Sequence, residues 1–416
     1  MKIINFIKDH KWLITIIAFA VILRFAYLFL IHPPLSWADA SLYDTVARNF
    51  SQGNGYTYSL TENEPFATRE PGYIIFFLTP IYFIFGHSIL AAQIFQIIIS
   101  VFIILLTYLI AKEILPKKLS LLSAFIITAW PPMIGYTGEI LTEIYFTFLL
   151  LVFMFLLIKA IQNPSKKLFF ASGLILGLAT LARFIMFFFP VFLLPILYII
   201  FRDRHKTFTY FLLILIGVAI FVSPWIIRNY MIYDAFILGR LGGGEIYWMG
   251  SYVPWDGEWF GYIEPFLSLC PKAKSAIEGD QCLTRLAIEN IKENPLGVGL
   301  IWLKKPLKVF LIPEGFEFIS TFAAKLKINT AFAKMSYLGL YLTGIIFAIL
   351  GLRDLFYTKR KIALLFSALL IYYTLMLLPL NPIFRYQIPI LPIISILASF
   401  GLYNFYLLIK SKIQYG

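Results

Sequence analysis

Three acidic residues beside long apolar runs are the side chains of this chain best suited to chemistry. Asp39 follows the first apolar run, and Glu139 and Glu143 stand between two later runs. A charged side chain at the centre of a bilayer costs about 3 kcal/mol on insertion scales, so such a carboxylate is expected to face a water-filled cavity and to serve a function. Whether the three can share one site depends on how the chain crosses the membrane.

The composition predicts a membrane protein. Of 416 residues, 60% are hydrophobic and 14% are charged, which excludes an ordinary soluble protein. Apolar runs of about 17 to 25 residues are long enough to span a bilayer as helices. Ten runs meet this description, at residues 12–31, 89–111, 119–134, 142–158, 168–182, 184–201, 208–226, 336–352, 362–379 and 388–409. The predicted fold class is an all-α polytopic membrane protein with about 10 to 11 transmembrane helices.

The basic residues predict the orientation of these helices. Every second loop is short and basic, as in Lys117-Lys118, Lys166-Lys167 and Lys359-Arg360-Lys361. Because such loops are retained in the cytoplasm, both termini are expected to be cytoplasmic, in a plasma (inner) membrane. The net charge of +13 then reflects topology, and its dispersal over loop ends does not indicate a nucleic-acid surface.

Two outer segments are large enough to build a site. The apolar segment 73–85 is too short for a crossing and is expected to be an interfacial or re-entrant helix. The chain then divides into an N-terminal transmembrane module (1–226) with a first outer loop at 32–88, an extracytoplasmic loop region (227–335) and C-terminal transmembrane helices (336–416). Within the second region, Trp302–Phe310 is an amphipathic stretch with three lysines, expected to lie on the membrane surface.

The only two cysteines, Cys270 and Cys282, both belong to the long outer loop. An oxidising compartment permits a disulfide between them, and two free thiols are the alternative. A zinc site built on them is not expected, because it needs about four ligands and the four histidines are scattered along the chain.

Seven short motifs, in order, give the chain a resemblance to the GT-C membrane glycosyltransferases. It looks most like the family of protein O-mannosyltransferases and lipid A aminoarabinose transferases (glycosyltransferase family 39 type). The motifs are Trp37-Ala38-Asp39-Ala40 with Tyr43, Gly55-Tyr56, Arg69-Glu70-Pro71-Gly72-Tyr73, Pro131-Pro132, Gly138-Glu139 through Thr142-Glu143, Pro224-Trp225-Ile226-Ile227-Arg228-Asn229-Tyr230, and Arg385-Tyr386-Gln387-Ile388-Pro389. One departure is that Leu42 and Glu70-Pro71-Gly72 replace the basic residue and Lys-Pro-Pro of the aminoarabinose enzymes, which argues against that donor sugar.

The resemblance implies an inverting transfer of a sugar from a polyprenyl (dolichyl or undecaprenyl) phosphate to an acceptor hydroxyl, on a protein, glycolipid or polysaccharide, outside the cytoplasm. It implies that Asp39 is the general base; the alternative is that Asp39 serves only as a helix cap. Glu139 and Glu143, four residues apart, would lie on one helix face. Glu143 is the better candidate for the acceptor or metal part of the site. Whether a divalent cation (Mg, Mn or Zn) is bound stays open.

A lipid phosphate requires cations near the membrane boundary. Arg69, Arg228 and Arg385 are predicted there, with Arg183 as a weaker candidate, and guanidinium groups can grip phosphate at two points. The alternative for each is an interfacial anchor. The substrate-binding candidates are Tyr43, Tyr56, Tyr73 and Glu70; an aromatic belt at the membrane surface would explain the tyrosines equally well.

Two other functions compete with this interpretation. A transporter or lipid flippase would place ionisable residues inside several spans and show inverted repeats. Here the predicted spans are nearly free of such residues, with Arg24 as the clear exception. An O-antigen polymerase or ligase would also have many spans and a large outer loop with arginines, but it is not expected to need an Asp in the first outer loop. Asp39 is therefore the discriminating residue.

Overall fold

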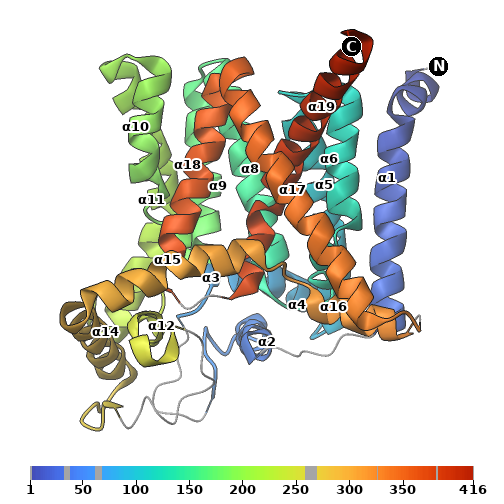
Figure 1. Ribbon diagram of the computed structural model, residues 1–416. Helices are drawn as coiled ribbons and strands as arrows, with labels where there is room; N and C mark the ends of the chain where they lie inside the picture. The colour runs from blue at the N-terminus through green and yellow to red at the C-terminus, as the bar shows by residue number, and fades with distance from the viewer. Residues whose placement is uncertain are drawn as a thin grey trace.

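The protein is a bundle of long helices with shorter helices gathered at one end. The computed structural model describes residues 2–31, 38–60, 68–257, 269–325, 327–380 and 383–415. Every regular element in these ranges is helical. Figure 1 shows both termini at one end of the bundle, with α2 (Ala38–Ser51), α12 (Gly243–Ser251) and α14 (Ala276–Glu293) at the opposite end.

Among the described residues, eight helices are long and apolar enough to cross a membrane. They comprise His10–Ile31 of α1 (Lys2–Ile31), α5 (Ile89–Lys112), α8 (Thr142–Gln162), Phe184–Phe201 including α10 (Phe189–Phe201), α11 (Arg204–Tyr233), α17 (Thr330–Thr358), α18 (Arg360–Leu377), and Phe384–Gln414, which joins η4 (Phe384–Ile390) to α19 (Leu391–Tyr415). Each coincides with a span predicted from the sequence, so the all-helical polytopic class is confirmed.

The other two predicted spans form shorter helices. Residues 119–134 are divided into α6 (Lys117–Ala129) and α7 (Pro131–Gly135), because Trp130 precedes a proline and takes an extended backbone conformation. Buried Arg24 of α1 crosses this break, donating to the carbonyls of Thr128 and Met133 at 3.3 Å each. The second short helix is α9 (Lys166–Ala182), which packs between α8 and α11.

Glycines let two helix pairs approach closely. A Cβ atom on Gly173 of α9 would lie 2.4 Å from the Ile214 carbonyl oxygen of α11, and one on Gly351 of α17 would lie 1.9 Å from the Leu397 oxygen of α19. Small residues at such crossings are typical of helices that pack within a membrane, where backbone contact replaces the hydrophobic effect as the driving force. These two crossings hold α9 and α19 in place.

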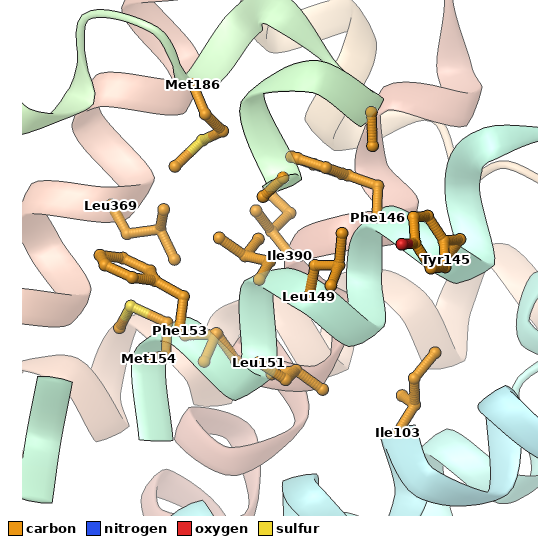
Figure 2. Close-up of a cluster of buried hydrophobic side chains, with 14 of the residues drawn as sticks. Ile103, Tyr145, Phe146, Leu149, Leu151, Phe153, Met154, Met186, Leu369 and Ile390 are labelled. Carbon is orange, nitrogen blue, oxygen red and sulfur yellow. The ribbon is translucent and has the colours of Figure 1, made fainter. Parts of the chain in front are cut away.

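The most enclosed of these helices is α8. Leu149, Phe153 and Met154 on α8 belong to a cluster of buried side chains that also contains Leu369 of α18 and Met186 (Figure 2). Since α8 is buried along most of its length, the residues of its first turn are held firmly. That turn contains Glu143.

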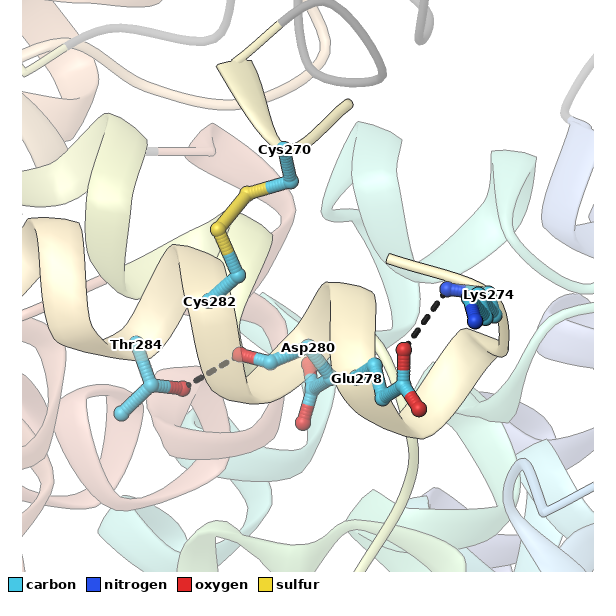
Figure 3. Close-up of a disulfide and its surroundings, with 6 residues drawn as sticks. All are labelled: Cys270, Lys274, Glu278, Asp280, Cys282 and Thr284. Atoms are coloured by element: carbon cyan, nitrogen blue, oxygen red, sulfur yellow. Dashed lines mark hydrogen bonds between the residues drawn. A yellow bond between two sulfur atoms is a disulfide. The ribbon is translucent and has the colours of Figure 1, made fainter. Parts of the chain in front are cut away.

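The end opposite the termini carries the segments predicted as outer loops. The apolar segment 71–85 is a single short helical run, too short to count as a span, made of α3 (Pro71–Tyr73), the π-helix η1 (Ile74–Leu78) and α4 (Thr79–Phe85). The structure joins Cys270 to Cys282 of α14 in a disulfide (Figure 3). The carboxylate of Asp280, also on α14, accepts hydrogen bonds from the backbone N–H groups of Gly242 and Gly244 at 3.0 and 2.7 Å.

The predicted amphipathic stretch belongs to α15 (Pro295–Leu311), which lies across the ends of the bundle helices in Figure 1. A row of leucines on it is exposed: Leu296, Leu300, Leu303, Leu307 and Leu311. One lysine departs from the expected polar face. Lys305 is buried and donates to the carbonyls of Gly250 and Leu378 at 2.6 and 3.0 Å, so it ties α15 to α12 and α18.

Candidate active site

Asp39 lies in the first turn of α2, where its carboxylate meets two guanidinium groups. Arg69 Nη1 is 2.6 Å from Asp39 Oδ1, and Arg385 Nη2 is 2.6 Å from Asp39 Oδ2. Each carboxylate oxygen therefore has its own arginine, from a segment distant in the sequence. Charge-assisted bonds of this length are strong, and together they bring α2, the segment before α3 and η4 to one point.

The two arginines control the acidity of Asp39. Burial alone would raise the pKa of this carboxyl, but the charges of Arg385 and Arg69 outweigh burial and lower the pKa to about 2. Asp39 is thus ionised at any physiological pH. With its lone pairs engaged by two cations, it is also a weak base in this arrangement.

Glu143, in the first turn of α8, forms the second half of the ion-pair network. Its side chain has no exposed surface and pairs with Arg183, whose Nε also donates to Thr142 Oγ1 at 2.8 Å. Arg385 Nε lies 3.5 Å from Glu143 Oε1. Arg385 therefore contacts both carboxylates and joins them into one network.

The segment that carries Arg69 is held from three directions. The Tyr56 hydroxyl donates to the Arg69 carbonyl, and Thr68 Oγ1 accepts from the Leu241 N–H at 3.0 Å. Next to Arg69, Glu70 adopts a left-handed conformation (φ 38°) and pairs with Arg240 at 3.4 Å. A non-glycine residue in this conformation is uncommon, and the surrounding contacts determine it.

The position after Arg69-Glu70-Pro71 has no room for a side chain, which explains why Gly72 stands there. A Cβ atom there would lie 2.4 Å from the backbone nitrogen of Ala182. We expect Gly72→Ala to lower the free energy of unfolding by about 1 to 3 kcal/mol, because the short helix must move away from α9. Thermal unfolding of the purified protein measures this, with Gly299→Ala on α15 as the control, since a Cβ atom on Gly299 meets nothing within 4 Å. Equal stability of the two variants would contradict the prediction.

Five of the predicted site residues thus contact one another: Asp39, Glu143, Arg69, Arg183 and Arg385. Arg228 is not among them. Its guanidinium lies over the rings of Trp225 and Tyr56, at 4.5 and 5.4 Å from the centroids, and donates to Asn229 Oδ1 at 2.8 Å. It supports the segment that carries Arg69, through Tyr56.

The three tyrosines proposed as substrate contacts are buried. Tyr43 and Tyr73 pack edge to face at 5.8 Å between centroids, and Tyr56 packs against Trp225. Glu70 is occupied by Arg240. In this structure all four side chains are engaged with other residues of the protein.

The expectation that Glu139 and Glu143 share a helix face is wrong. The chain turns between α7 and α8, and α8 begins only at Thr142. The Glu139 carbonyl accepts from Gln96 Nε2 at 2.5 Å, which fixes the turn against α5. The Glu139 side chain accordingly lines a separate cavity, together with Tyr27 and Glu314.

Sequence reasoning missed several residues around the site. Arg240 and Thr142 hold Glu70 and Arg183, and Tyr82 and His87 both bond the Asp44 carboxylate, at 2.6 and 2.8 Å, which ties α2 to the short helix and its C-terminal end. Arg240 has no local signal, because it lies in an irregular part of a long loop. Asp44 and His87 carried a weak one, as polar residues of the first outer loop.

The residues near Asp39 do not fit a divalent cation. Within the described ranges, no three His, Cys, Asp or Glu side chains gather as metal ligands do. Asp39 and Glu143 are each engaged by arginines, and a metal would have to displace a guanidinium group.

Comparisons with known proteins agree with this architecture. Residues 69–227, more than a third of the chain, match the family model described as dolichyl-phosphate-mannose-protein mannosyltransferase. No curated protein sequence matches the chain.

Solved structures with a similar fold include two of an archaeal oligosaccharyltransferase. The apo crystal structure of the Archaeoglobus fulgidus oligosaccharyltransferase matches with a TM-score of 0.57 and 16% identity, over 97% of this chain and 52% of that one. The oligosaccharyltransferase AglB of Archaeoglobus fulgidus, in complex with an inhibitory peptide and a dolichol-phosphate, matches with a TM-score of 0.55 and 13% identity, over 95% and 50%. The chain therefore spans about half the length of these structures.

A third similar structure is ArnT from Cupriavidus metallidurans bound to undecaprenyl phosphate, with 13% identity over 94% of this chain and 78% of that one. Its TM-score of 0.46 is too low for a comparison of the two folds. At these identities the oligosaccharyltransferases show a shared fold, and the family model adds the sequence relationship. Together they confirm that the chain resembles the GT-C membrane glycosyltransferases of the protein O-mannosyltransferase family.

Proposed function

We propose that the protein is an inverting glycosyltransferase that moves a sugar from a polyprenyl phosphate to an acceptor hydroxyl. The observation that carries the proposal is the Asp39 carboxylate held between Arg69 and Arg385 at one end of the helix bundle. The family match supports the donor class, and a dolichol-phosphate accompanies the similar archaeal enzyme.

The proposed reaction is one displacement. The acceptor oxygen attacks the anomeric carbon, its proton passes to the Asp39 carboxylate, and the bond from that carbon to the phosphate oxygen breaks with its electron pair leaving on the phosphate. Attack from the face opposite the phosphate inverts the anomeric configuration. Guanidinium groups near the phosphate would stabilise the charge that develops on it.

The structure suggests how a weak base would become a stronger one. In the free protein, Arg69 and Arg385 neutralise Asp39 and hold its pKa low. A donor phosphodiester carries one negative charge and two non-bridging oxygens, as a carboxylate does, so it can take over these guanidinium groups through the same two-point contacts. When the arginines turn to the phosphate, Asp39 is left buried with fewer cations, and its pKa rises. Donor binding would thereby activate the base.

We propose the membrane topology of the chain on the same basis. Counting α6 and α9 with the eight long helices gives ten crossings, which places both termini in the cytoplasm and the Asp39 end outside. In this scheme residues 1–226 form the catalytic transmembrane module, 227–335 the outer loop region and 336–416 the C-terminal helices. The lysines and arginines of the short loops then lie on the cytoplasmic side.

The test is sugar transfer by the purified protein in nanodiscs. A panel of radiolabelled polyprenyl phosphate sugars is supplied with an extract of host membranes as the source of acceptors. We expect label to pass from one donor to a product of opposite anomeric configuration, which NMR of the isolated product determines. Retention of configuration would exclude the single displacement, and neither transfer nor binding of any donor would favour a transporter.

A further inference from the structure

A cavity of about 190 Å³ lies beside the ion-pair network and differs from it in charge. Its walls come from the outer end of α1, from α7, from the turn after α7, and from α16 (Phe316–Lys325) with the residues before it. Three glutamates line it: Glu139, Glu314 and Glu317. No Lys, Arg or His is among its described lining residues.

Aromatic rings complete the lining. Tyr27, Tyr136 and Phe318 contribute rings, and Tyr27 and Phe318 pack together with 5.2 Å between centroids. The Tyr136 hydroxyl is buried and meets no hydrogen-bond partner of ordinary geometry among the described residues; it lies beside the Glu314 carboxyl. Carboxylates combined with aromatic faces are the chemistry that binds organic cations.

The backbone of Glu314 is held by two hydrogen bonds, and its carboxyl lies beside the Gly315 N–H and the Tyr136 hydroxyl. Its N–H donates to Gln387 Oε1 at 3.2 Å, and its carbonyl accepts from the Tyr337 hydroxyl at 2.5 Å. Gly315, with φ 99°, follows directly, and a Cβ atom there would lie 3.1 Å from Pro132 Cγ. The position of this glutamate in the wall is therefore built into the fold.

Gln387 also connects the cavity to the proposed active site. It lies on η4, two residues after Arg385, so one short helix holds both the guanidinium that bridges Asp39 and Glu143 and the amide that anchors Glu314. Tyr136, in the cavity wall, is close enough to the network for Glu143 and Arg385 to influence its pKa, although burial is the main reason that this pKa is raised.

We propose that this cavity binds the positively charged amine group of the acceptor substrate. The inference rests on the proposed glycosyltransferase function and adds the chemical class of the acceptor. A donor phosphate would be repelled by three glutamates and attracted by the arginines on the other side, so the charges separate the two substrates. Burial raises the pKa of the Glu314 carboxyl, and neighbouring Glu143 and Glu317 add to the effect, so a bound cation would relieve an unfavourable charge there.

The first test measures the cavity alone. Tetramethylammonium is the probe, and tert-butanol is its uncharged counterpart of similar size. Saturation-transfer NMR on the full-length protein in dodecyl maltoside is expected to detect tetramethylammonium and not tert-butanol. Glu314→Gln should weaken binding about tenfold or more, the loss of one charge-assisted contact. Glu289→Gln, an exposed carboxylate on α14, is the control and should leave binding unchanged.

A second variant covers the case in which Glu314→Gln fails to fold. Thr321→Lys places an ammonium group in the cavity from an exposed position on α16 and should abolish tetramethylammonium binding, whereas Thr321→Ser should not. Equal binding of the two probes, or tetramethylammonium binding that survives Thr321→Lys, would overturn the proposal.

The second test separates the acceptor assignment from the function itself. Tetramethylammonium should inhibit sugar transfer competitively with acceptor and leave the binding of radiolabelled donor unchanged. Binding of tetramethylammonium without inhibition would overturn the acceptor assignment. If no donor supports transfer while Glu314-dependent binding persists, the proposed function fails and the cavity remains a cation site.

Discussion

Asp39→Asn is expected to lower the rate of sugar transfer by about 10²- to 10⁴-fold, the usual contribution of a general base. Asparagine keeps the size of the side chain and one acceptor oxygen, so α2 should stay in place. It has no basic oxygen to take the acceptor's proton. It also no longer holds Arg69 and Arg385 by charge, which frees both for a phosphate. Donor binding should therefore be retained or become tighter while transfer is lost.

Single-turnover transfer and equilibrium binding of a radiolabelled donor measure these two effects separately. The control is Asp44→Asn on the same helix, since Asp44 bonds Tyr82 and His87 and not the arginines. Transfer by Asp44→Asn should be close to that of the wild type. Full transfer by Asp39→Asn would remove the general-base role, and loss of donor binding with it would point to a structural role.

The pH dependence of the wild-type enzyme tests activation by the donor. The acid limb of kcat/KM reports the free enzyme and that of kcat the enzyme–substrate complex. In the free protein the arginines hold the Asp39 pKa at about 2, so the active, ionised form is lost only as the pH falls toward that value. Release of the arginines to the phosphate raises this pKa, so kcat should fall at a higher pH than kcat/KM. Coincident acid limbs would show that the arginines do not change partner.

The sequence predicted much of this site because strong physical constraints act on it. Charged residues are rare in a chain of this hydrophobicity, and the short basic loops assign each span a direction. That direction alone places Asp39, Glu143, Arg69 and Arg385 at one end of the bundle, and the structure brings their side chains into contact. The long apolar runs likewise predicted the eight helices that have the length of a full crossing.

The sequence did not predict contacts between segments that are distant along the chain. Arg240 reaches Glu70 and Gln387 anchors Glu314 across large separations in the chain, and neither pair leaves a periodic pattern. Breaks in helices were also missed. Pro131 ends α6 before it reaches the length of a span, and the turn before Thr142 separates Glu139 from Glu143. A hydropathy window averages over such breaks, because the residues on both sides remain apolar.

Arg385→Ala is expected to impair both donor binding and transfer, because Arg385 is the one described residue that pairs with both Asp39 and Glu143. Removing it leaves each carboxylate with a single arginine in a buried setting. Breaking a buried ion pair costs about 3 to 5 kcal/mol. If a comparable part of this free energy is lost from the contact between the guanidinium group and the donor phosphate, donor affinity falls by about 10²-fold or more. Donor binding at equal folded amount, followed by single-turnover transfer, measures the effect.

Two further variants show whether Arg385 acts through its charge or through its shape. Arg385→Lys keeps the charge, but an ammonium group cannot span two carboxylates as the guanidinium fork does, so donor affinity should fall between those of the wild type and Arg385→Ala. Arg353→Ala, an exposed arginine that pairs with Asp354 on α17, is the control and should leave donor binding unchanged. The double variant Asp39→Asn/Arg385→Ala should lose less stability than the sum of the single changes, because each single change leaves an unbalanced partner. Strict additivity would mean that Asp39 and Arg385 do not stabilise each other in the free protein, and unchanged donor binding in Arg385→Ala would mean that Arg385 does not hold the phosphate.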